Sequence, residues 1–516
     1  MVSRITSGAV HGIESFLVQV EVDVSNGLPG LELVGLLSSE VREAKERVRV
    51  ALKNTGVNLP PTRITVSLSP ADLRKQGSAF DLPIAAGILE SLGVFGPERF
   101  QESIVAGELG LDGRVRPVRG ILPMVLEAKR RGKKCCVIPK ENAKEALLVE
   151  QMRVVAVNDL KEFIGFAKGE RKEEAPLAGE DDRTEENEGE RNNLPDFREL
   201  GGALRIRRAA EIAAAGFHHM LMLGPPGSGK TLAARCMPGI LPELSGEEIL
   251  EVSAIYSVAG LWGRESGKRM ESRPFVSPHH TVTPQALAGG GAVPRPGAVS
   301  LAHHGVLFLD EMTEFKRSTL DLLRQPLEEK RICITRNHGN YIYPADFMLV
   351  AAANPCPCGY YPDRRRCRCS EAEVKRYLGR ISGPVLDRID LCVETKRVEF
   401  SDLEGTKQGE DSRHMRERVL DARRVQEERF RGRKIRYNAQ MSPGELGEFC
   451  ALGSEERRFM ERIFEPFGLS ARGYHRMLKT ARTIADLEQS DDIRTAHLSE
   501  ALSFRADLNR EERADG

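Results

Sequence analysis

The segment from Gly224 to Thr231, GPPGSGKT, constrains the fold of this 516-residue chain more than any other feature. It matches the pattern G-x-x-x-x-G-K-[ST], and it lies between the apolar run HMLMLG and the helical pattern TLAARCM. A loop of this kind turns successive backbone N–H groups toward phosphate oxygens at the start of a helix. The sequence therefore predicts an α/β nucleotide-binding domain whose loop residues are Gly224, Pro225, Pro226, Gly227, Ser228, Gly229, Lys230 and Thr231.

Two further apolar runs end in polar side chains of the kind that nucleotide hydrolysis requires. One, GVLFLDE, ends in Asp310 and Glu311, and the other, FMLVAAAN, ends in Asn354. We expect Lys230 to neutralise the β- and γ-phosphates of ATP, and Thr231 and Asp310 to hold Mg²⁺. Glu311 is expected to orient or deprotonate the attacking water, and the Asn354 amide to position that water.

The length of the chain suits three or four domains of about 150 residues each. Residues 1–167 alternate strand-like and helical patterns, which predicts an α/β or α+β domain. Residues 168–193 include KGERKEEAPLAGEDDRTEENEGER, which is acidic, has few apolar residues and is predicted to be a solvated linker. Residues 194–395 form the predicted α/β core, and residues 396–516 show helical patterns.

The charge balance of the chain is neutral, with 76 Lys and Arg against 76 Asp and Glu. This neutrality does not exclude a nucleic-acid partner, because the acidic excess lies in the linker while basic residues gather at Arg364–Arg368 and Arg413–Arg436. A solvated helix face is the alternative interpretation of the second stretch. The sequence shows no apolar run near the roughly 18 residues of a membrane span and no apolar secretory segment, so we expect a cytoplasmic protein without a membrane partner.

Four of the ten cysteines lie close together in the sequence, as two C-x-C pairs separated by eight residues. In a reducing compartment such a cluster favours metal over disulfide. Four thiolates suit a tetrahedral structural Zn²⁺, although the spacing departs from the usual C-x₂-C. Reduced structural thiols and a redox pair are the alternatives to a zinc site at Cys356, Cys358, Cys367 and Cys369.

Five segments together resemble the AAA+ ATPases of the magnesium-chelatase-like group, most closely its ComM/YifB branch: GPPGSGKT, LFLDE, AAANPCPCG, RISGPVLDRIDL and LSARGYHRMLKTART. The resemblance covers nearly the whole chain and implies a hexameric ring ATPase with a helical lid and with nucleotide sites between subunits. It assigns the Walker A, Walker B and sensor 1 roles to Lys230, Thr231, Asp310, Glu311 and Asn354. It also makes Arg388 an arginine finger for the neighbouring subunit and Arg472 the sensor 2 residue, with Arg380 as a lesser interface candidate.

The N-terminal domain resembles the proteolytic domain of Lon, which has a ribosomal protein S5 domain 2-like fold, in KQGSAFDLPIAAGILESLG, GELGLDGRVRPVRGIL and EAKRRGKKCCVIPKENAKEA. The Ser and Lys positions of that protease fall on about Ala79 and Leu122. Ser78 is one residue away, but a hydroxyl without a base is a poor nucleophile. We therefore predict a structural or DNA-engaging domain without protease activity.

Two insertions in the core are predicted to contact the substrate. One is the Gly/Pro-rich segment SPHHTVTPQALAGGGAVPRPGAVSLAHHG, and the other is a hairpin at Lys330–Pro344. In the magnesium-chelatase-like group such insertions face the pore of the ring, which here would present to nucleic acid the side chains of Arg331, Arg336, His338 and Tyr341. Polar packing, more than metal binding, is expected for the paired histidines His279, His280, His303 and His304.

The resemblance implies an ATP-driven DNA motor. ComM-like proteins are associated with helicase and branch-migration activity in DNA uptake and recombination, so the expected partners are single-stranded or branched DNA and further copies of the chain. A chelatase subunit that drives metal insertion into a tetrapyrrole is an alternative, against which the Lon-like domain argues. A protein-remodelling ATPase is the other. Stimulation of ATP hydrolysis by DNA distinguishes the first function from both alternatives.

Overall fold

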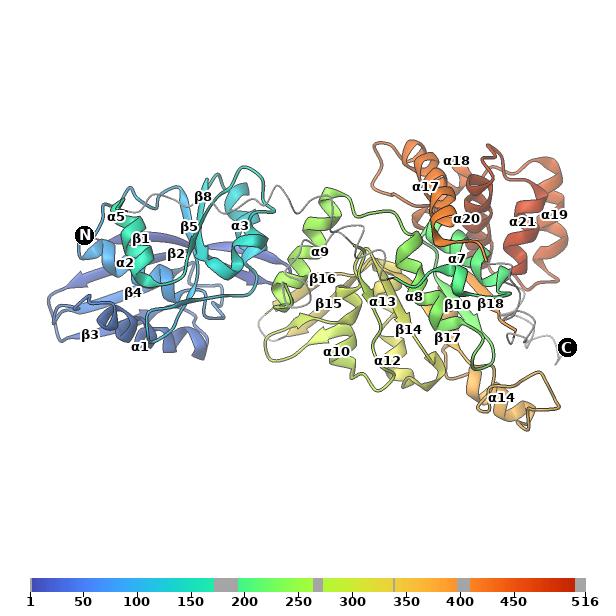
Figure 1. Ribbon diagram of the computed structural model, residues 1–516, viewed down its shortest axis with the longest axis horizontal. Helices are drawn as coiled ribbons and strands as arrows, with labels where there is room; N and C mark the ends of the chain where they lie inside the picture. Colours follow the sequence, from blue (N-terminus) through green and yellow to red (C-terminus); the bar gives the residue numbers. More distant parts are fainter. Residues whose placement is uncertain (1, 171–193, 263–271, 337–338, 397–408, 506–516) are drawn as a thin grey trace.

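The computed structural model describes residues 2–170, 194–262, 272–336, 339–396 and 409–505. Figure 1 shows an elongated molecule with the N-terminal domain at one end, the nucleotide-binding core in the middle and the C-terminal helices at the other end. Most of the predicted acidic linker, residues 171–193, lies outside the described residues. Within the described part of the chain, no helix is both long and apolar enough to cross a membrane.

The N-terminal domain contains two main sheets. The first has the order β1-β2-β4-β3, with β3 parallel to β4 and the other neighbours antiparallel. The second is parallel, with the order β5-β8-β9. The strands are β1 (Ser3–His11), β2 (Glu14–Ser25), β3 (Gly30–Val34), β4 (Arg63–Ser69), β5 (Ser103–Val105), β6 (Glu108–Leu109), β7 (Val115–Arg116), β8 (Cys135–Pro139) and β9 (Arg153–Val157).

Helices cover these sheets and bury their apolar faces. In α1 the apolar residues recur at helical spacing and are buried, while the charged residues between them are mostly exposed. In contrast, α2 is almost entirely buried and lies against β1 and β2. The helices are α1 (Ser39–Asn54), α2 (Asp81–Ser91), α3 (Ile121–Arg130), α4 (Ala143–Ala146) and α5 (Leu160–Lys168), with a 3₁₀ turn at Lys140–Asn142.

The core is built on a five-stranded parallel sheet with the order β11-β14-β17-β10-β18. Alternate residues of its strands enter two hydrophobic clusters, one on each face, so the central strands read as continuous apolar runs. The parallel α/β sheet that the sequence predicts is therefore present. The strands are β10 (Met220–Leu223), β11 (Phe275–Val276), β14 (Val306–Leu309), β17 (Met348–Ala353) and β18 (Leu391–Glu394).

The helices of the core lie on both faces of this sheet. On one face, α7 and α8 share a cluster with the C-terminal helices, and on the other face the insertions and α12 pack together. The helices are α7 (Leu204–Gly216), α8 (Lys230–Ile240), α9 (Gly246–Ala259), α10 (Pro284–Ala288), α11 (Ala298–Leu301), α12 (Arg317–Asp321), α13 (Arg324–Glu329), α14 (Glu371–Leu378) and α15 (Gly383–Leu386), with 3₁₀ turns at Phe197–Glu199 and Met312–Glu314.

The insertions form small β-structures beside the sheet. The predicted hairpin is present as β15 (Arg331–Arg336) and β16 (Gly339–Pro344), which are antiparallel. The Gly/Pro-rich insertion contains α10, β12 (Gly289–Gly290) and β13 (Arg295–Pro296), and the Tyr343 hydroxyl donates to the Pro294 carbonyl at 2.8 Å. This contact ties the two insertions into one unit.

The regular elements of the C-terminal part, residues 409–505, are all helices. Its helices are α17 (Ser412–Arg429), α18 (Pro443–Phe449), α19 (Ser454–Phe464), α20 (Ala471–Leu487) and α21 (Thr495–Ser503), with a 3₁₀ turn at Asn438–Gln440. Helix α17 packs on α7 and α8, and α20 packs on α7, so this bundle lies on the side of the sheet that carries α7 and α8 (Figure 1). Ser470 caps α20 by accepting from the Gly473 amide, which places Arg472 in the first turn.

The N-terminal domain contacts the core through α3 and α9. The Gly120 and Leu122 amides donate to the Ser257 carbonyl and hydroxyl at 3.1 and 3.4 Å. Ala79 and Leu122, at the positions of the Lon dyad, are buried in one cluster with Ala254 of α9. The position of the protease site is thus covered by the core.

Sequence reasoning missed a buried lysine near Ser78. Lys75 is fully buried, and burial lowers the pKa of its amine. Its Nζ donates to the Pro70 and Leu73 carbonyls, while the Ser78 hydroxyl donates to the carboxylate of Glu108. Lys75 therefore supports a turn in this structure and is not a partner of the Ser78 hydroxyl.

Candidate nucleotide-binding site

The phosphate loop joins β10 to α8 at the carboxyl end of the parallel sheet, where Asp310, Asn354 and Thr395 also lie. Close packing explains the first glycine, since a Cβ on Gly224 would lie 1.9 Å from the Thr395 hydroxyl oxygen. Gly227 and Gly229 have φ of +74° and +82°, a region that side chains rarely adopt. The loop therefore requires glycine at these three positions for steric reasons.

Lys230, the first residue of α8, directs its amine into the loop. Its Nζ donates to the Gly224 and Pro225 carbonyls at 2.6 and 2.8 Å and lies 3.4 Å from the Asn354 Oδ1. Burial lowers the pKa of Lys230 to about 8, and the nearby carboxylates of Asp310 and Glu311 oppose this effect. The predicted Walker A lysine and the sensor 1 amide thus meet at one site.

Thr231 and Asp310 offer the oxygen ligands that Mg²⁺ prefers. The Thr231 hydroxyl donates to the Asp310 Oδ2 at 2.8 Å, and the other carboxylate oxygen accepts from the Glu311 amide at 2.9 Å. A hydroxyl and a carboxylate beside the phosphate loop fit the octahedral, oxygen-only coordination of Mg²⁺. The residues that the sequence predicts for this ion are therefore adjacent in space.

Glu311 has a left-handed backbone with φ of +50°, and its side chain is exposed beyond the end of β14. Its Oε2 lies 3.6 Å from the Nδ1 of His280, which follows the neighbouring strand β11. His280 was predicted to be a packing residue, and the sequence carries no signal of this contact with Glu311, the predicted Walker B glutamate.

The two predicted interface arginines lie together beside α13. Arg388 follows α15 and pairs with Glu328 of α13, and Arg472 of α20 approaches the same Glu328 oxygen at 4.0 Å. Arg380 donates to the Thr313 carbonyl and the Glu314 carboxylate at 3.2 Å. The ion-pair partner that both arginines share within the described chain is therefore Glu328 of α13, and not Asp310 or Glu311 of the nucleotide site.

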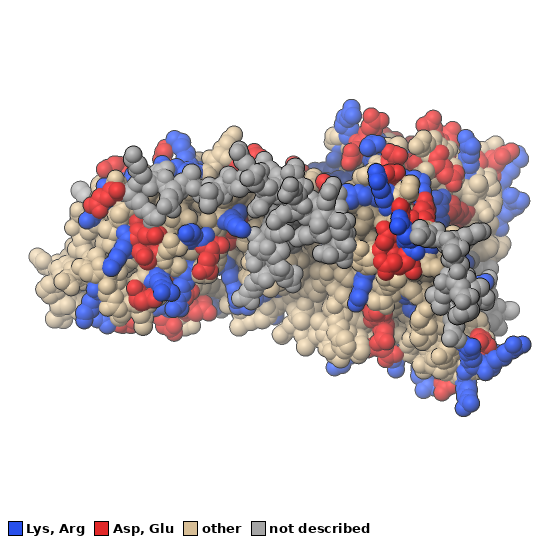
Figure 2. Space-filling view, in the orientation of Figure 1, with Lys and Arg blue, Asp and Glu red and all other residues tan. Residues whose placement is uncertain are grey.

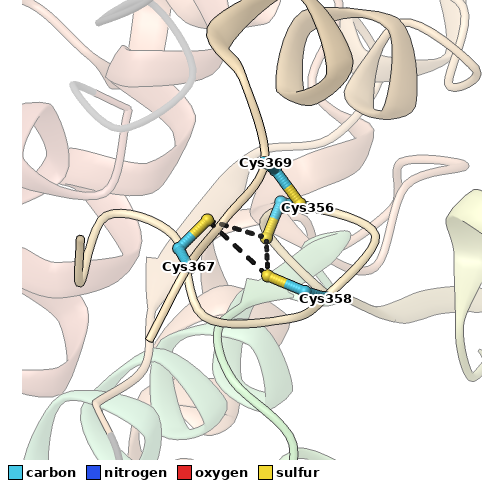
Figure 3. Close-up of side chains that lie close together, drawn as sticks. All are labelled: Cys356, Cys358, Cys367 and Cys369. Atoms are coloured by element: carbon cyan, nitrogen blue, oxygen red, sulfur yellow. Dashed lines mark hydrogen bonds between the residues drawn. The ribbon is translucent and has the colours of Figure 1, made fainter. Parts of the chain in front are cut away.

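The four cysteines converge after β17 (Figure 3). The Sγ atoms of Cys356, Cys358 and Cys367 are 3.3 to 3.7 Å apart, and all four sulfurs, including that of Cys369, lie within 4.8 Å of one another. Tetrahedral Zn²⁺ with Zn–S bonds of about 2.3 Å requires sulfurs about 3.8 Å apart. The donor set thus fits zinc.

The surroundings of the cysteines also suit a structural metal. The Tyr361 amide donates to the Cys356 sulfur at 3.4 Å. Burial would raise the pKa of Cys358, but hydrogen bonds from the Tyr360 amide and the neighbouring thiols lower it to about 6. A Cβ on Gly359 would lie 2.7 Å from the Pro226 side chain and 4.0 Å from that of Asn354. The loop that carries the four cysteines, residues 356–369, which we call the cysteine knuckle, therefore packs against the phosphate loop.

A second cluster, Glu251 with His303 and His304, has the spacing of a metal site. The nitrogen of His303 that faces Glu251, however, carries a proton. The His303 Nδ1 accepts from the Asp346 amide at 3.0 Å, so in the neutral ring Nε2 carries the proton and donates to Glu251 at 3.1 Å. A protonated nitrogen does not ligate a metal. This geometry favours the predicted polar packing.

The residues that were predicted to contact DNA differ in how exposed they are. Tyr341 is only 5% exposed, and its ring stacks on that of His11 with centroids 4.3 Å apart, so the prediction that it stacks on nucleic acid is wrong for this structure. The hydrogen bond between the His11 Nε2 and the Asn340 carbonyl, 3.1 Å long, strengthens this contact with the N-terminal domain. Arg331 and Arg336 are exposed, whereas His338 lies outside the described residues.

The two basic stretches differ in how many of their charges are paired. In the first, Arg365 and Arg368 are exposed and make no ion pair within the described residues, and Figure 2 shows Lys and Arg side chains gathered at the corner where α14 lies. In the second, most arginines pair with acidic residues, for example Arg429 with Asp486 at 2.7 Å and Arg436 with Glu247 at 2.9 Å. Most arginines of that stretch are therefore held in ion pairs within the chain, so the choice between a DNA contact and a solvated helix face stays a prediction.

Comparison with family models agrees with this geometry. Residues 196–403 match the model described as magnesium chelatase, subunit ChlI, and residues 409–505 match the model of the C-terminal part of that subunit. Residues 20–142 match a model described as subunit ChlI of Mg-chelatase. The N-terminal domain therefore also matches a chelatase-subunit model, so its presence does not argue against a chelatase function, contrary to the expectation from the sequence.

The phosphate loop, the Walker acids and the parallel sheet define the chain as an AAA+ ATPase of the magnesium-chelatase-like class. It is 42% identical over 501 residues to the competence protein ComM of Haemophilus influenzae, covering 97% of this chain and 96% of that protein. It is 41% identical over 505 residues to YifB of Escherichia coli, covering 98% and 97%. The chain belongs to the ComM/YifB family.

A more distant relative supports the resemblance to Lon only in part. The chain is 29% identical over 171 residues to Lon protease 2 of Bacillus subtilis, which covers 30% of this chain and 31% of that protein. This similarity is too short to carry the activity of the whole protease to this chain.

Proposed function

We propose that the protein is an ATP-hydrolysing hexameric ring that moves DNA, and that it acts as a helicase or branch-migration factor in natural transformation and recombination. The pairing of Thr231 with Asp310 beside the amine of Lys230 supports the ATPase step most directly. The full-length similarity to a protein named for competence supports the DNA-related role.

In the proposed reaction Lys230 exchanges its two carbonyl partners for the β- and γ-phosphate oxygens of ATP. Thr231 and Asp310 hold Mg²⁺, which neutralises charge on those phosphates when it is bound. Glu311 accepts a hydrogen bond from the attacking water, and the Asn354 amide, next to Lys230, orients that water toward the γ-phosphate.

Arg388 and Arg472 complete the proposed site from the neighbouring subunit. Both lie beside α13, and a guanidinium that reaches a neighbour's γ-phosphate stabilises the charge that develops there. Hydrolysis would then require assembly of the ring. The shared position beside α13 supports the proposal that both arginines act in trans.

We further propose that the cysteines hold a structural Zn²⁺ and that the knuckle they form contacts DNA. Arg364, Arg365, Arg366 and Arg368 lie in the knuckle and are exposed. Arg365 and Arg368 make no ion pair within the described residues and are available to phosphates, whereas Arg364 pairs with Glu371 and Arg366 with Asp363. Arg331 and Arg336 of the hairpin would add phosphate contacts in the pore.

The test is ATP hydrolysis by the purified full-length protein with single-stranded, forked and four-way DNA. We expect stimulation by DNA that declines steeply with salt. Lys230→Ala should lose nucleotide binding, whereas Glu311→Gln should bind ATP and turn it over slowly. Hydrolysis that none of these DNA substrates changes would contradict the motor function.

Two other functions stay open to the same experiment. The matches to ChlI models favour a chelatase-type subunit that drives metal insertion, and the partial similarity to Lon favours a protein-remodelling ATPase. Hydrolysis stimulated by a chelatase partner with a tetrapyrrole, or by an unfolded protein, and not by DNA would identify one of these instead.

A further inference from the structure

Glu328 lies between the two arginines that are proposed to serve the neighbouring nucleotide. It is the fifth residue of α13, and one of its carboxylate oxygens, Oε1, pairs with Nη2 of Arg388. The same oxygen is 4.0 Å from Nη2 of Arg472, which comes from α20. A single carboxylate oxygen thus faces two guanidinium groups from separate elements, α20 and the segment after α15.

The Arg388 side chain is held inside its own subunit. It is only 12% exposed, whereas the side chain of Arg472 is 71% exposed. Besides the pair with Glu328, Nη1 of Arg388 donates to the Pro384 carbonyl, and its Nε is buried without a hydrogen-bond partner. Both terminal nitrogens therefore have partners in the same chain, and the guanidinium is not presented to a neighbour.

A carboxylate is a suitable substitute for a phosphate in front of arginine. Both are anions whose oxygens match the planar fork of the guanidinium. The carboxylate carries less charge than a terminal phosphate, and Glu328 is half exposed, so this ion pair is weak enough to exchange. A neighbour's γ-phosphate would compete with Glu328 for the same N–H groups.

We propose that Glu328 is a positioning residue that holds Arg388 within its own subunit when no neighbour's nucleotide is present. Its carboxylate then occupies the place of the γ-phosphate in front of the guanidinium. This ion pair raises the protein concentration at which the ring becomes active. The proposal rests on the ring ATPase proposed above. Engagement of the finger must displace Glu328, so the ion pair opposes assembly of the active site between subunits.

The adjacent glutamate supplies a matched control. Glu329 is 48% exposed, against 50% for Glu328, and it pairs with Arg331 at 3.3 Å and accepts from Gln325 at 3.3 Å. It has no contact with either interface arginine among the described residues. Glu329→Gln therefore removes the same charge from the same helix without releasing Arg388.

The experiment measures ATP hydrolysis by the full-length protein as a function of protomer concentration. Glu328→Gln should lower the concentration of half-maximal activity about 2- to 5-fold, the change expected from losing an ion pair whose carboxylate is screened by solvent. Glu329→Gln should leave that concentration unchanged, and binding of a fluorescent ADP should be the same in all three proteins. A Glu328→Gln protein with an unchanged or higher half-maximal concentration would overturn the proposal.

The double variant tests whether Glu328 acts through Arg388. In an Arg388→Ala background, Glu328→Gln should have no further effect on assembly or hydrolysis, and a persisting effect would exclude Arg388 as the route. If Glu328→Gln fails to bind ADP, Glu328→Asp replaces it, since its shorter carboxylate should weaken retention in the same direction. Full hydrolysis by Arg388→Ala alone would instead contradict the arginine finger, and with it the proposed ring mechanism.

Discussion

The two halves of the proposed catalytic site differ in how far a single folded chain prepares them. We call Lys230, Thr231, Asp310 and Asn354 the cis half, and Arg388 and Arg472 the trans half. In the cis half the groups already contact one another at 2.8 to 3.4 Å. In the trans half both arginines face Glu328 of their own subunit.

This difference indicates where control of hydrolysis lies. The cis half is fixed by the sheet, because its residues follow neighbouring parallel strands or begin the helix after the loop. The trans half depends on side chains that must exchange partners. Nucleotide binding should therefore be a property of the protomer, and hydrolysis a property of the assembly.

The largest expected effect comes from the trans half. Arg388→Ala should lower the rate of ATP hydrolysis about 10³-fold or more, the usual contribution of an arginine finger. Binding of ATP to the protomer should change little, because the polar partners of Arg388 in the described chain are Glu328 and the Pro384 carbonyl and not residues of the phosphate loop. Steady-state hydrolysis together with equilibrium binding of a fluorescent ATP analogue measures both quantities, and a loss of binding equal to the loss of rate would contradict the division into halves.

Glu311→Gln should lower hydrolysis of the nucleotide that is bound by the same subunit. Removing a general base costs about 10²-fold in kcat, while the amide that replaces the carboxylate leaves ATP binding intact. The Glu311 side chain is exposed beyond β14, so the substitution should not change the melting temperature. Single-turnover hydrolysis by the assembled protein provides the measurement, and Glu314→Gln, three residues along the chain, is the control.

The cis half could be predicted from the sequence because local patterns encode it. The GPPGSGKT loop, the acids after β14 and the amide after β17 each follow an apolar run, and parallel strands bring the ends of such runs together. The Lys330–Pro344 hairpin was likewise predictable from alternation and turn residues.

The rest depends on contacts between residues far apart in the chain. No motif marks Glu328, which acquires its place only when α13 meets the segment after α15 and the start of α20. Tyr341 stacks on His11, more than 300 positions away, and the acidic partners of Arg429 and Arg436 lie outside the basic stretch. A run of basic residues in the sequence therefore does not show which of its charges are paired with acidic residues in the folded chain.

The pH dependence of ATP binding gives a smaller effect within the cis half. Without nucleotide the pKa of Lys230 is about 8, because burial disfavours the ammonium form, whereas bound phosphates favour it. Below pH 8 the amine is already protonated, and above pH 8 binding must take up a proton. The apparent affinity for ATP should therefore fall about tenfold between pH 7 and pH 9.

A Lys230→Arg protein tests this assignment. Arginine stays protonated across that range, so its binding, even if weaker overall, should show no comparable fall. Titrations with a fluorescent ATP analogue at constant Mg²⁺ and salt measure both proteins. A wild-type affinity that stays constant from pH 7 to pH 9 would contradict the lowered pKa.

Substitutions in the cysteine knuckle should have the smallest effect on ATP hydrolysis, because the knuckle packs against the cis half and supplies no catalytic group. Cys356 is two residues from Asn354, and Gly359 packs against Pro226 of the phosphate loop. Cys356→Ser should abolish stoichiometric zinc and lower hydrolysis about 2- to 5-fold, since a loosened Asn354 positions water less well. Cys333→Ser, at an exposed site on β15, should change neither. The measurements are metal analysis and ATP hydrolysis assays of both variants. Zinc retained by Cys356→Ser would contradict a zinc site at the four cysteines. Loss of zinc with full hydrolysis would show that the knuckle does not support the catalytic residues of the cis half.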